Sequence, residues 1–484
     1  MKLHDYRKSM RARTSFHAAL MLGLGVFFVA HAALAKDLYV DGSTGDDSVS
    51  YAQNDASNPW ATLGRAVWGN TNRSNPNSSQ AAQAGDVVIV RAGVYSTNQG
   101  TGERYEPIYN TVNSGRPGSP ITIRAEGAVT LRSNTNTGGE PILGSLERSY
   151  IVWDGFIIDE ANVNTTPDTG PTGVWGADNI TLQNLTIRGI SAPWSDNHNS
   201  IRIELSSNVL IRNNRLSGNR GANNQFNGSA IMLYDTHDVT IEHNEIFDSE
   251  GGIFIKSSLH SPPHYNIIIR YNLLYDLHVG ITHAEVSDSA GTFGARTYQN
   301  IVRDCFFGIV VRGYTNSTPA NVDIVNNTIY GNQHGLFLMP STNGYEDIVV
   351  KNNIVANNGT SIQGEDISDV SQLQFSHNLY SRGGTLARIQ YNNYSLAGWQ
   401  TTFAQDRTGS FQGDPAFMGP NSGDFRLGNN SPARNAGVDV LNLLGQGVTA
   451  NITMGAYVTG SENIGLTDEL AVATFTRPSP PVLE

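Results

Sequence analysis

Short runs of alternating apolar and polar residues recur along the middle of this chain, and an asparagine follows one run in each repeat. Such alternation is typical of a β-strand with one buried face. The asparagines are Asn184, Asn214, Asn244, Asn272, Asn300, Asn327, Asn353 and Asn378, at intervals that shorten from 30 to 25 residues. Recurrence at so steady a period indicates a repeat architecture.

Each repeat contains another β-rich run, which usually follows a glycine. Examples are SIRIEL, AIMLYD, GIFIKS and GIVVRG. Short strands repeated without intervening helices do not fit a doubly wound α/β sheet. They fit an all-β solenoid, a single-stranded parallel β-helix in which each coil adds one strand to each of two or three sheets. We expect the asparagines to pair between coils through their amides, which is a structural role.

The two ends of the chain depart from the repeat and are predicted to cap the stack. A helix is predicted with Asn58 as N-cap and Pro59 as its first residue, where it would cover the open edge of the first coil. Strand-like runs follow at 86–95, 121–127 and 150–159. We predict a β-helix with its N-terminal cap over 36–400, and a C-terminal cap with a loose Pro-rich tail over 401–484.

Residues 1–35 have the organisation of a secretory signal peptide. Five basic residues surround the start, an apolar stretch covers 18–30, and Ala33-Leu34-Ala35 supplies a small-residue cleavage site. The apolar stretch is too short for a lasting membrane span. We therefore predict a secreted or periplasmic protein that leaves the membrane after cleavage and is monomeric.

The net charge narrows the class of partner. The formal charge is −12, and removal of the leader takes away five basic residues and one acidic residue, which leaves −16. So acidic a chain does not fit general nucleic-acid binding. An anionic polymer would need a local basic cleft. The single cysteine, Cys305, lies in an apolar run and is expected to be a buried thiol.

Aligning the glycine-led runs predicts which side chains share a face. Positions in phase with Ile201 and Ile203 are almost all apolar and should face the core. The outward positions form two columns: Arg202, Met232, Phe254, Thr282, Val310 and Phe337, then Glu204, Tyr234, Lys256, Ala284, Arg312 and Met339. Adjacent coils place Tyr234 and Lys256 roughly 5 Å apart at the backbone. We predict Lys256, Tyr234 and Arg312 as catalytic residues, and substrate binding by Arg202, Glu204 and Phe254.

Further candidates surround this face. His260, in the loop after Lys256, is predicted to contact substrate. His283 falls in an inward apolar column, so it is either a core histidine or, through a bulge, a substrate-binding residue beside Lys256. Asp235 and Glu285 are candidate ligands of a calcium ion, which prefers oxygen donors. No histidine has the spacing of a zinc site.

These residue types match the needs of β-elimination in a uronic-acid polysaccharide. A cation neutralises the C5 carboxylate, a base removes the C5 proton and an acid protonates the leaving O4. Lys256 would be the base if burial and the neighbouring Arg312 lower its pKa. Tyr234 would be the acid. Arg312, Arg202 or a bound Ca²⁺ would hold the substrate carboxylate.

Several phrases resemble right-handed parallel β-helix proteins of the pectate lyase type: DLYVDGSTGDD, NPWATLGRAV, GDVVIVRAGVY and GDPAF…GDFRL…SPARNAG. The resemblance covers nearly the whole chain after the leader. EHNEIFDSEGGIFIKSS is similar to a stretch of the alginate lyase and chondroitinase B family that ends in a catalytic lysine and a serine, here Lys256 and Ser257. The family's calcium-binding glutamates would fall near Glu250. Its catalytic arginine would fall on Ala284, with Arg312 one coil later. Other β-helix lyases use a lysine–tyrosine pair.

The predicted function is a secreted polysaccharide lyase that acts on an alginate-like or pectin-like anionic polymer. A β-helix glycoside hydrolase is one alternative, but it needs two carboxylates about 5–9 Å apart, and the predicted face carries only Glu204. A uronate epimerase would share the proton abstraction. A non-catalytic carbohydrate-binding or adhesion protein is the remaining alternative, because this fold hosts many functions.

Overall fold

The computed structural model describes residues 35–467, except for 101, 104, 134–139, 163–169, 190–197, 220–226, 257–264, 286–293, 314–317, 340–343, 366–369, 382–384, 439 and 441–451. The side chain of Glu285 is also outside the described part. The predicted signal peptide lies outside it but for residue 35, and the Pro-rich tail lies outside it from residue 468. Both stay predictions.

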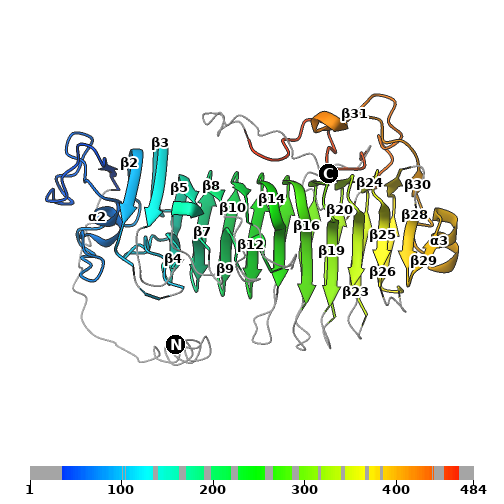
Figure 1. Ribbon diagram of the computed structural model, residues 1–484, viewed down its shortest axis with the longest axis horizontal. Helices are drawn as coiled ribbons and strands as arrows, with labels where there is room; N and C mark the ends of the chain where they lie inside the picture. Colours follow the sequence, from blue (N-terminus) through cyan, green and yellow to red (C-terminus); the bar gives the residue numbers. More distant parts are fainter. Residues whose placement is uncertain are drawn as a thin grey trace, which may run out of the picture. The chain divides into compact units, whose positions relative to one another are not determined.

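The chain winds into a parallel β-helix, as predicted (Figure 1). Its strands pair in three series. The first sheet contains β4 (Leu143–Leu146), β6 (Thr172–Trp175), β9 (Ile201–Glu204), β12 (Ser229–Tyr234), the second half of β14 (Glu245–Lys256), the second half of β16 (Leu273–Glu285), β19 (Phe307–Gly313), β22 (His334–Met339), β25 (Thr360–Gly364) and β28 (Thr385–Ile389). The short β29 (Asn392–Tyr394) pairs antiparallel with β28.

The second sheet runs from the N-terminal end to near the C-terminal end. It contains β1 (Asp37–Val40), β2 (Val87–Thr97), β3 (Ile121–Ser133), β5 (Ile151–Asp159), β7 (Asp178–Gln183), β10 (Ser207–Arg212), β13 (His237–Glu242), β15 (Tyr265–Arg270), β17 (Ala295–Tyr298), β20 (Ala320–Val325), β23 (Glu346–Lys351) and β26 (Leu373–Ser376).

The third sheet consists of the short strands that follow the asparagine turns. It contains the ends of β2, β3 and β5, then β8 (Thr186–Arg188), β11 (Arg215–Ser217), the first halves of β14 and β16, β18 (Ile301–Arg303), β21 (Thr328–Tyr330), β24 (Ile354–Ala356), β27 (Leu379–Tyr380) and β30 (Phe411–Gln412). In the described part of the chain the β-helix therefore has three series of parallel strands, the larger of the two numbers predicted. No described helix is long and apolar enough to cross a membrane.

The predicted alignment of the first sheet is confirmed residue for residue. Ile231 pairs with Ile201 on one side and Ile253 on the other, and the same phase continues through Ile281 and Ile309. All five side chains are buried in the main core. In-register stacking of parallel strands places chemically similar side chains above one another, so one apolar column per strand position builds the interior.

The asparagine ladder forms as predicted, with one correction. Asn244 Nδ2 donates to Asn272 Oδ1 over 2.9 Å, and the Asn244 main-chain N–H donates to the same oxygen over 3.0 Å. The same pattern links the members from Asn214 to Asn378: Asn214, Asn244, Asn272, Asn300, Asn327, Asn353 and Asn378. Asn184 is not a member, because Gln183 pairs with Arg212 and Leu185 therefore occupies the ladder position.

The N-terminal helix exists but begins later than predicted. Helix α2 covers Leu63–Trp68, and its N-cap is Thr62, whose hydroxyl accepts the N–H of Arg65 over 3.2 Å. Asn58 and Pro59 precede it, because Trp60 forms a β-bridge to Val40 and so keeps this stretch extended. The prediction placed the right kind of element at this end of the stack with the wrong start.

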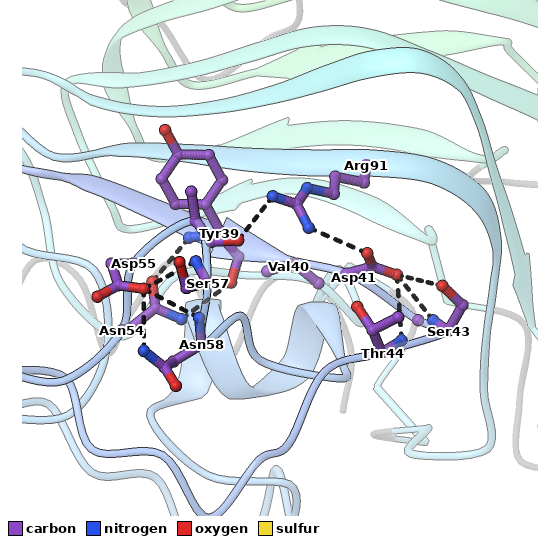
Figure 2. A network of polar contacts seen from close by, with 12 residues as sticks. Tyr39, Val40, Asp41, Ser43, Thr44, Asn54, Asp55, Ser57, Asn58 and Arg91 are labelled. Carbon is purple, nitrogen blue, oxygen red and sulfur yellow. Dashed lines mark hydrogen bonds and ion pairs between the residues drawn. The ribbon is translucent and has the colours of Figure 1, made fainter.

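Side chains around β1 satisfy the main chain at this end of the stack (Figure 2). Asn54 accepts the N–H of Tyr39 over 2.7 Å and donates to its carbonyl over 2.9 Å, which imitates a neighbouring strand. Asp41 accepts the N–H and hydroxyl of Ser43, and Arg91 pairs with it over 3.2 Å. The hydrogen bonds from Ser43 are the main cause of a lowered pKa at Asp41.

The C-terminal part first closes the stack and then returns along it. Helix α3 (Leu396–Thr402) buries Trp399, whose indole N–H donates to Asp406 over 3.0 Å. Asp406 also accepts from Asn378 and so ends the asparagine ladder. Beyond β31 (Phe417–Gly419), the 3-10 helix Pro420–Ser422 and β32 (Asp424–Leu427), residues 452–467 run back along the coils.

Residues 452–467 contact one turn position on successive coils. The Thr453 carbonyl accepts from Asn326 over 2.8 Å. The N–H of Gly465 donates to the Tyr271 carbonyl over 2.7 Å. The N–H of Thr467 donates to Asn213 Oδ1 over 2.8 Å. The returning segment, drawn in red in Figure 1, therefore ties together coils that are far apart in sequence. A 3-10 turn at Glu160–Asn162 completes the described elements.

Candidate active site

The outward column of the first sheet places the predicted catalytic residues in register. Tyr234 pairs with Glu204 on one side and with Lys256 on the other. Lys256 pairs with Ala284, and Ala284 pairs with Arg312. Each step up the stack is about 4.8 Å, so Arg312 lies two steps, or roughly 10 Å at the backbone, from Lys256. The small Ala284 between them leaves room for both long side chains to approach each other.

Lys256 is a partly buried amine among aromatic rings and arginines. Its Nζ lies 5.9 Å from the ring centre of Tyr234 and 5.9 Å from that of Phe254. Burial, followed by the charges of Arg202 and Arg312, lowers the pKa of Lys256 from its usual value near 10.5 to about 8. At mildly alkaline pH a large fraction of this amine is therefore neutral and able to accept a proton.

Arg202 is the second cation on this face, and Glu204 holds it. Arg202 Nε donates to Glu204 Oε1 over 2.5 Å, and the Arg202 Cζ lies 5.9 Å from the Tyr234 ring centre. Glu204 is only 2% exposed and its carboxylate is engaged by Arg202. The structure places Glu204 as a support for Arg202 with almost no exposed surface, and its predicted role in substrate binding stays a prediction.

Phe254 also lies deeper than predicted. It is fully buried and packs with Met232 and Ala284 in a small apolar cluster on the outer side of the sheet, separate from the main core. The Phe254 side chain has no exposed surface in this conformation, and its predicted role in substrate binding stays a prediction. Its ring supports the Lys256 side chain and contributes to the burial that lowers the lysine pKa.

His283 faces the core, and the alternative of a bulge that turns it outward is wrong. The pairing between β14 and β16 is continuous at this point, with Ile255 opposite His283 and Lys256 opposite Ala284. His283 is fully buried, its Nε2 lies 3.0 Å from Thr297 Oγ1, and burial lowers its pKa to about 3. It is a neutral core histidine, the first of the two predicted alternatives.

The described residues hold no group of three or more histidine, cysteine, aspartate or glutamate side chains that could bind a metal ion. Asp235 is 1% exposed, in a turn with a left-handed φ of 54°, which gives it little access to a surface ion. The side chain of Glu285 and all of His260 lie outside the described residues. Their predicted roles in calcium and substrate binding therefore stay predictions.

Two buried asparagines and one partly buried asparagine belong to this site although the sequence reading missed them. Lys256 Nζ donates to Asn227 Oδ1 over 3.1 Å. Asn199 accepts from Arg202 over 3.0 Å, and Asn219 Nδ2 donates to the Gly228 carbonyl over 2.9 Å. All three lie outside the regular strands, where the loop length varies from coil to coil. The repeat gave no signal for Asn227, because it precedes Lys256 by 29 residues whereas the adjacent coils are 22 residues apart at this strand.

The fold agrees with a family model described as "Right handed beta helix region", which matches residues 172–323. The chain is a right-handed parallel β-helix. No curated protein matches its sequence.

Solved structures with a similar fold carry several activities in their names. Pectate lyase Pel9A is 15% identical with a TM-score of 0.49, over 87% of this chain and 96% of that one. A PL6 family polysaccharide lyase from Pseudopedobacter saltans is 15% identical with a TM-score of 0.42, over 73% and 96%. A polygalacturonase from Erwinia carotovora ssp. carotovora is 12% identical with a TM-score of 0.47, over 73% and 93%. At such identities the similarity concerns the fold and leaves the reaction open.

Proposed function

We propose that this protein is an exported polysaccharide lyase that cleaves a uronic-acid polymer by β-elimination. The observation that carries the proposal is the position of Lys256, which lies one coil from Tyr234, with Arg202 and Arg312 two coils away on opposite sides. The reaction requires a base, an acid and a cation for the carboxylate, and this face offers all three. The pKa of Lys256, lowered to about 8, suits a general base near neutral pH.

In the proposed reaction the neutral Lys256 amine takes the proton from C5 of a uronate. The electron pair of the broken C5–H bond forms the C4–C5 double bond, and the C4–O4 bond breaks. Tyr234 gives its hydroxyl proton to the leaving O4. Lys256 then carries one extra proton and Tyr234 lacks one, so a single proton transfer from lysine to tyrosine restores both groups.

The two arginines are proposed to bind the carboxylate at C5. A planar guanidinium can engage both carboxylate oxygens, and neutralising this charge makes the C5 proton more acidic. Two contacts fix the direction of the Arg202 guanidinium. It donates to the Glu204 carboxylate, and it donates to Asn199 over 3.0 Å. Arg312, in β19, approaches from the other end of the column.

The main alternatives differ in what they require of this face. A glycoside hydrolase needs two carboxylates flanking the bond, and in the described part of the outward column the carboxylate is Glu204, which is nearly buried. A uronate epimerase would return a proton to C5 from the opposite side instead of breaking C4–O4. A binding or adhesion protein would not need a lysine with a lowered pKa. These differences favour the lyase over the hydrolase and the binding protein, and the assay below separates it from the epimerase.

The remaining parts of the proposal concern the setting of the reaction. An anionic polysaccharide as substrate fits a local cluster of one lysine and two arginines on a chain with net charge −12. We propose a secreted or periplasmic location from the predicted leader at 1–35. A calcium ion bound near Glu285 would reinforce the arginines. We propose a monomer that needs no partner for the reaction.

The deciding experiment is incubation of the mature protein with alginate, pectate, chondroitin and glucuronan in parallel, with and without calcium. Elimination creates an unsaturated uronate whose ultraviolet absorbance rises with time, and this rise is the expected result. New reducing ends without the absorbance would favour a hydrolase. Isotope exchange at C5 without chain cleavage would favour an epimerase. Binding without any of these changes would contradict the catalytic proposal.

A further inference from the structure

The segment that precedes β12 is held by buried amide side chains. Asn199 Nδ2 donates to the main-chain carbonyls of Asn227 and Ser229, over 2.8 Å in each case. Asn219 Nδ2 donates to the carbonyl of Gly228 between them over 2.9 Å. Both asparagines are buried. Three consecutive carbonyls thus have defined partners, and this orients the peptide groups of residues 227–229.

From this segment the Asn227 side chain reaches the proposed base. Lys256 Nζ donates to Asn227 Oδ1 over 3.1 Å. The contact joins the start of β12 to the end of β14, while the strands themselves pair Tyr234 with Lys256. A lysine side chain has four rotatable bonds, so without such a contact its amine would sample many positions.

We propose that Asn227 is a positioning residue that holds the Lys256 amine at one point of the sheet face through a neutral acceptor. This inference rests on the proposed lyase function, which makes Lys256 the base. An amide oxygen accepts a hydrogen bond from either protonation state of the amine without adding a formal charge. A carboxylate at the same place would also position the amine, but it would favour the protonated form, which cannot take the C5 proton.

The same support extends to a proposed carboxylate-binding group. Asn199, which anchors the carbonyl of Asn227, also accepts from Arg202 Nη1 over 3.0 Å. Asn199 therefore binds the cation Arg202 directly and supports the base Lys256 indirectly, through Asn227. Such shared support keeps the distance between them constant, and an error of about 1 Å in a catalytic arrangement can cost 10²-fold in rate.

The charged groups around the Lys256 amine decide how strongly a substitution at position 227 would change the pKa of Lys256. Among the described residues, the titratable and charged side chains around Lys256 are Arg202 and Glu204 from β9, Tyr234 from β12 and Arg312 from β19. Glu204 is paired with Arg202. A new carboxylate at position 227 would therefore be the nearest negative charge to the amine.

The test compares Asn227→Asp and Asn227→Ala with a matched control, Asn429→Asp, which adds the same charge at an exposed turn. Lysine labelled at Cε and Nζ reports the pKa of Lys256 directly by NMR. The chain has five lysines, so Lys256→Arg identifies the signal by its loss. Steady-state kinetics over a pH series give kcat and KM for the polymer that the wild type cleaves.

Asn227→Asp should raise the Lys256 pKa by about 1–3 pH units, as an opposite charge this close does. The rising limb of kcat/KM against pH should move to higher pH by the same amount. Asn227→Ala should lower kcat about 10- to 100-fold with little change in KM, because the amine is still present but no longer held in place. The control should leave the pKa and the pH profile unchanged.

Two results would overturn the inference. One is an unchanged Lys256 pKa in folded Asn227→Asp, and the other is a wild-type kcat in Asn227→Ala. If Asn227→Asp does not fold, Asn227→Ser serves as the second variant, since its shorter side chain cannot span the contact and should behave like alanine. A raised Lys256 pKa in a protein that cleaves no uronate polymer would support the contact at Asn227 and contradict the lyase function.

Discussion

Lys256 and Tyr234 occupy the same outward position on adjacent coils, and the lysine Nζ lies 5.9 Å from the centre of the tyrosine ring. In-register stacking produces this neighbourhood from two residues that are 22 positions apart in the chain. Lys256, an amine with a lowered pKa, is suited to accept a proton, and Tyr234, a phenol, is suited to donate one.

Removal of either side chain should stop elimination and leave the fold intact. Lys256→Ala and Tyr234→Phe should each lower kcat by about 10²–10⁴-fold, the usual contribution of one general acid or base. Lys351→Ala, in the second sheet, is the control and should keep wild-type activity. The measurement is the initial rate of ultraviolet absorbance, with circular dichroism to check folding. Activity retained in both site variants would contradict the assignment of base and acid.

The activity should depend on pH through the charge of Lys256. The amine must be neutral to accept the C5 proton, so kcat/KM should rise with pH through about 8 and then level off. Arg312→Gln removes a positive charge that lowers this pKa, and it should therefore raise the Lys256 pKa and move the rising limb to higher pH. An unmoved limb in Arg312→Gln would mean that the limb reports another group.

Interruption of the asparagine ladder should lower the stability of the fold without changing the proposed catalytic residues. Asn272 Oδ1 accepts both the main-chain N–H and the Nδ2 of Asn244, over 3.0 and 2.9 Å. Asn272→Ala removes the acceptor of the buried Asn244 main-chain N–H, whereas Asn244 Nδ2 keeps the Ile211 and Glu242 carbonyls as acceptors. We expect a loss of roughly 1–3 kcal/mol in the free energy of unfolding, the usual cost of one buried unpaired polar group. Asn429→Ala, in an exposed turn, should change little. Equal midpoints in urea for the two variants would refute this reading of the ladder.

The buried His283 should make the fold sensitive to acid. Its pKa is about 3 in the folded protein, whereas an unfolded histidine has a pKa near 6.5. Between these two values the unfolded state binds more protons, so stability should fall as pH drops below about 6.5. His283→Leu, which cannot be protonated, should lose less stability than the wild type between pH 7 and pH 4. Parallel loss in both proteins, measured by urea unfolding, would assign the acid sensitivity to other groups.

The repeat could be predicted from the sequence because its causes are local. Alternation of apolar and polar residues defines the two faces of each strand, and the constant phase of the strands defines which residues share a column. For this reason the column that contains Tyr234, Lys256 and Arg312 was aligned correctly. Asn184 was wrongly assigned to the asparagine ladder because its residue type matches the other members. The backbone register puts Leu185, its neighbour, in the ladder position.

The start of the first helix depended on a contact that the local sequence does not show. Asn58 and Pro59 form an acceptable helix start, but Trp60 bridges to Val40 of β1, and Thr62 becomes the cap. Pairing with a strand 20 residues earlier outweighed the local preference. The return of residues 452–467 along the coils is a similar case, since it joins Thr467 to Asn213.

The sequence by itself determined the coil, the phase of its strands and the outward direction of Lys256, because stacking in register converts a spacing along the chain into a position in space. Only the tertiary structure decided the depth of each side chain. It buried Phe254 and Glu204, turned His283 to the core and brought Asn227 to the lysine amine. Burial and hydrogen bonding depend on atoms from several coils and from the connections between them. These connections vary in length and do not follow the repeat, so their contacts could not be predicted from it.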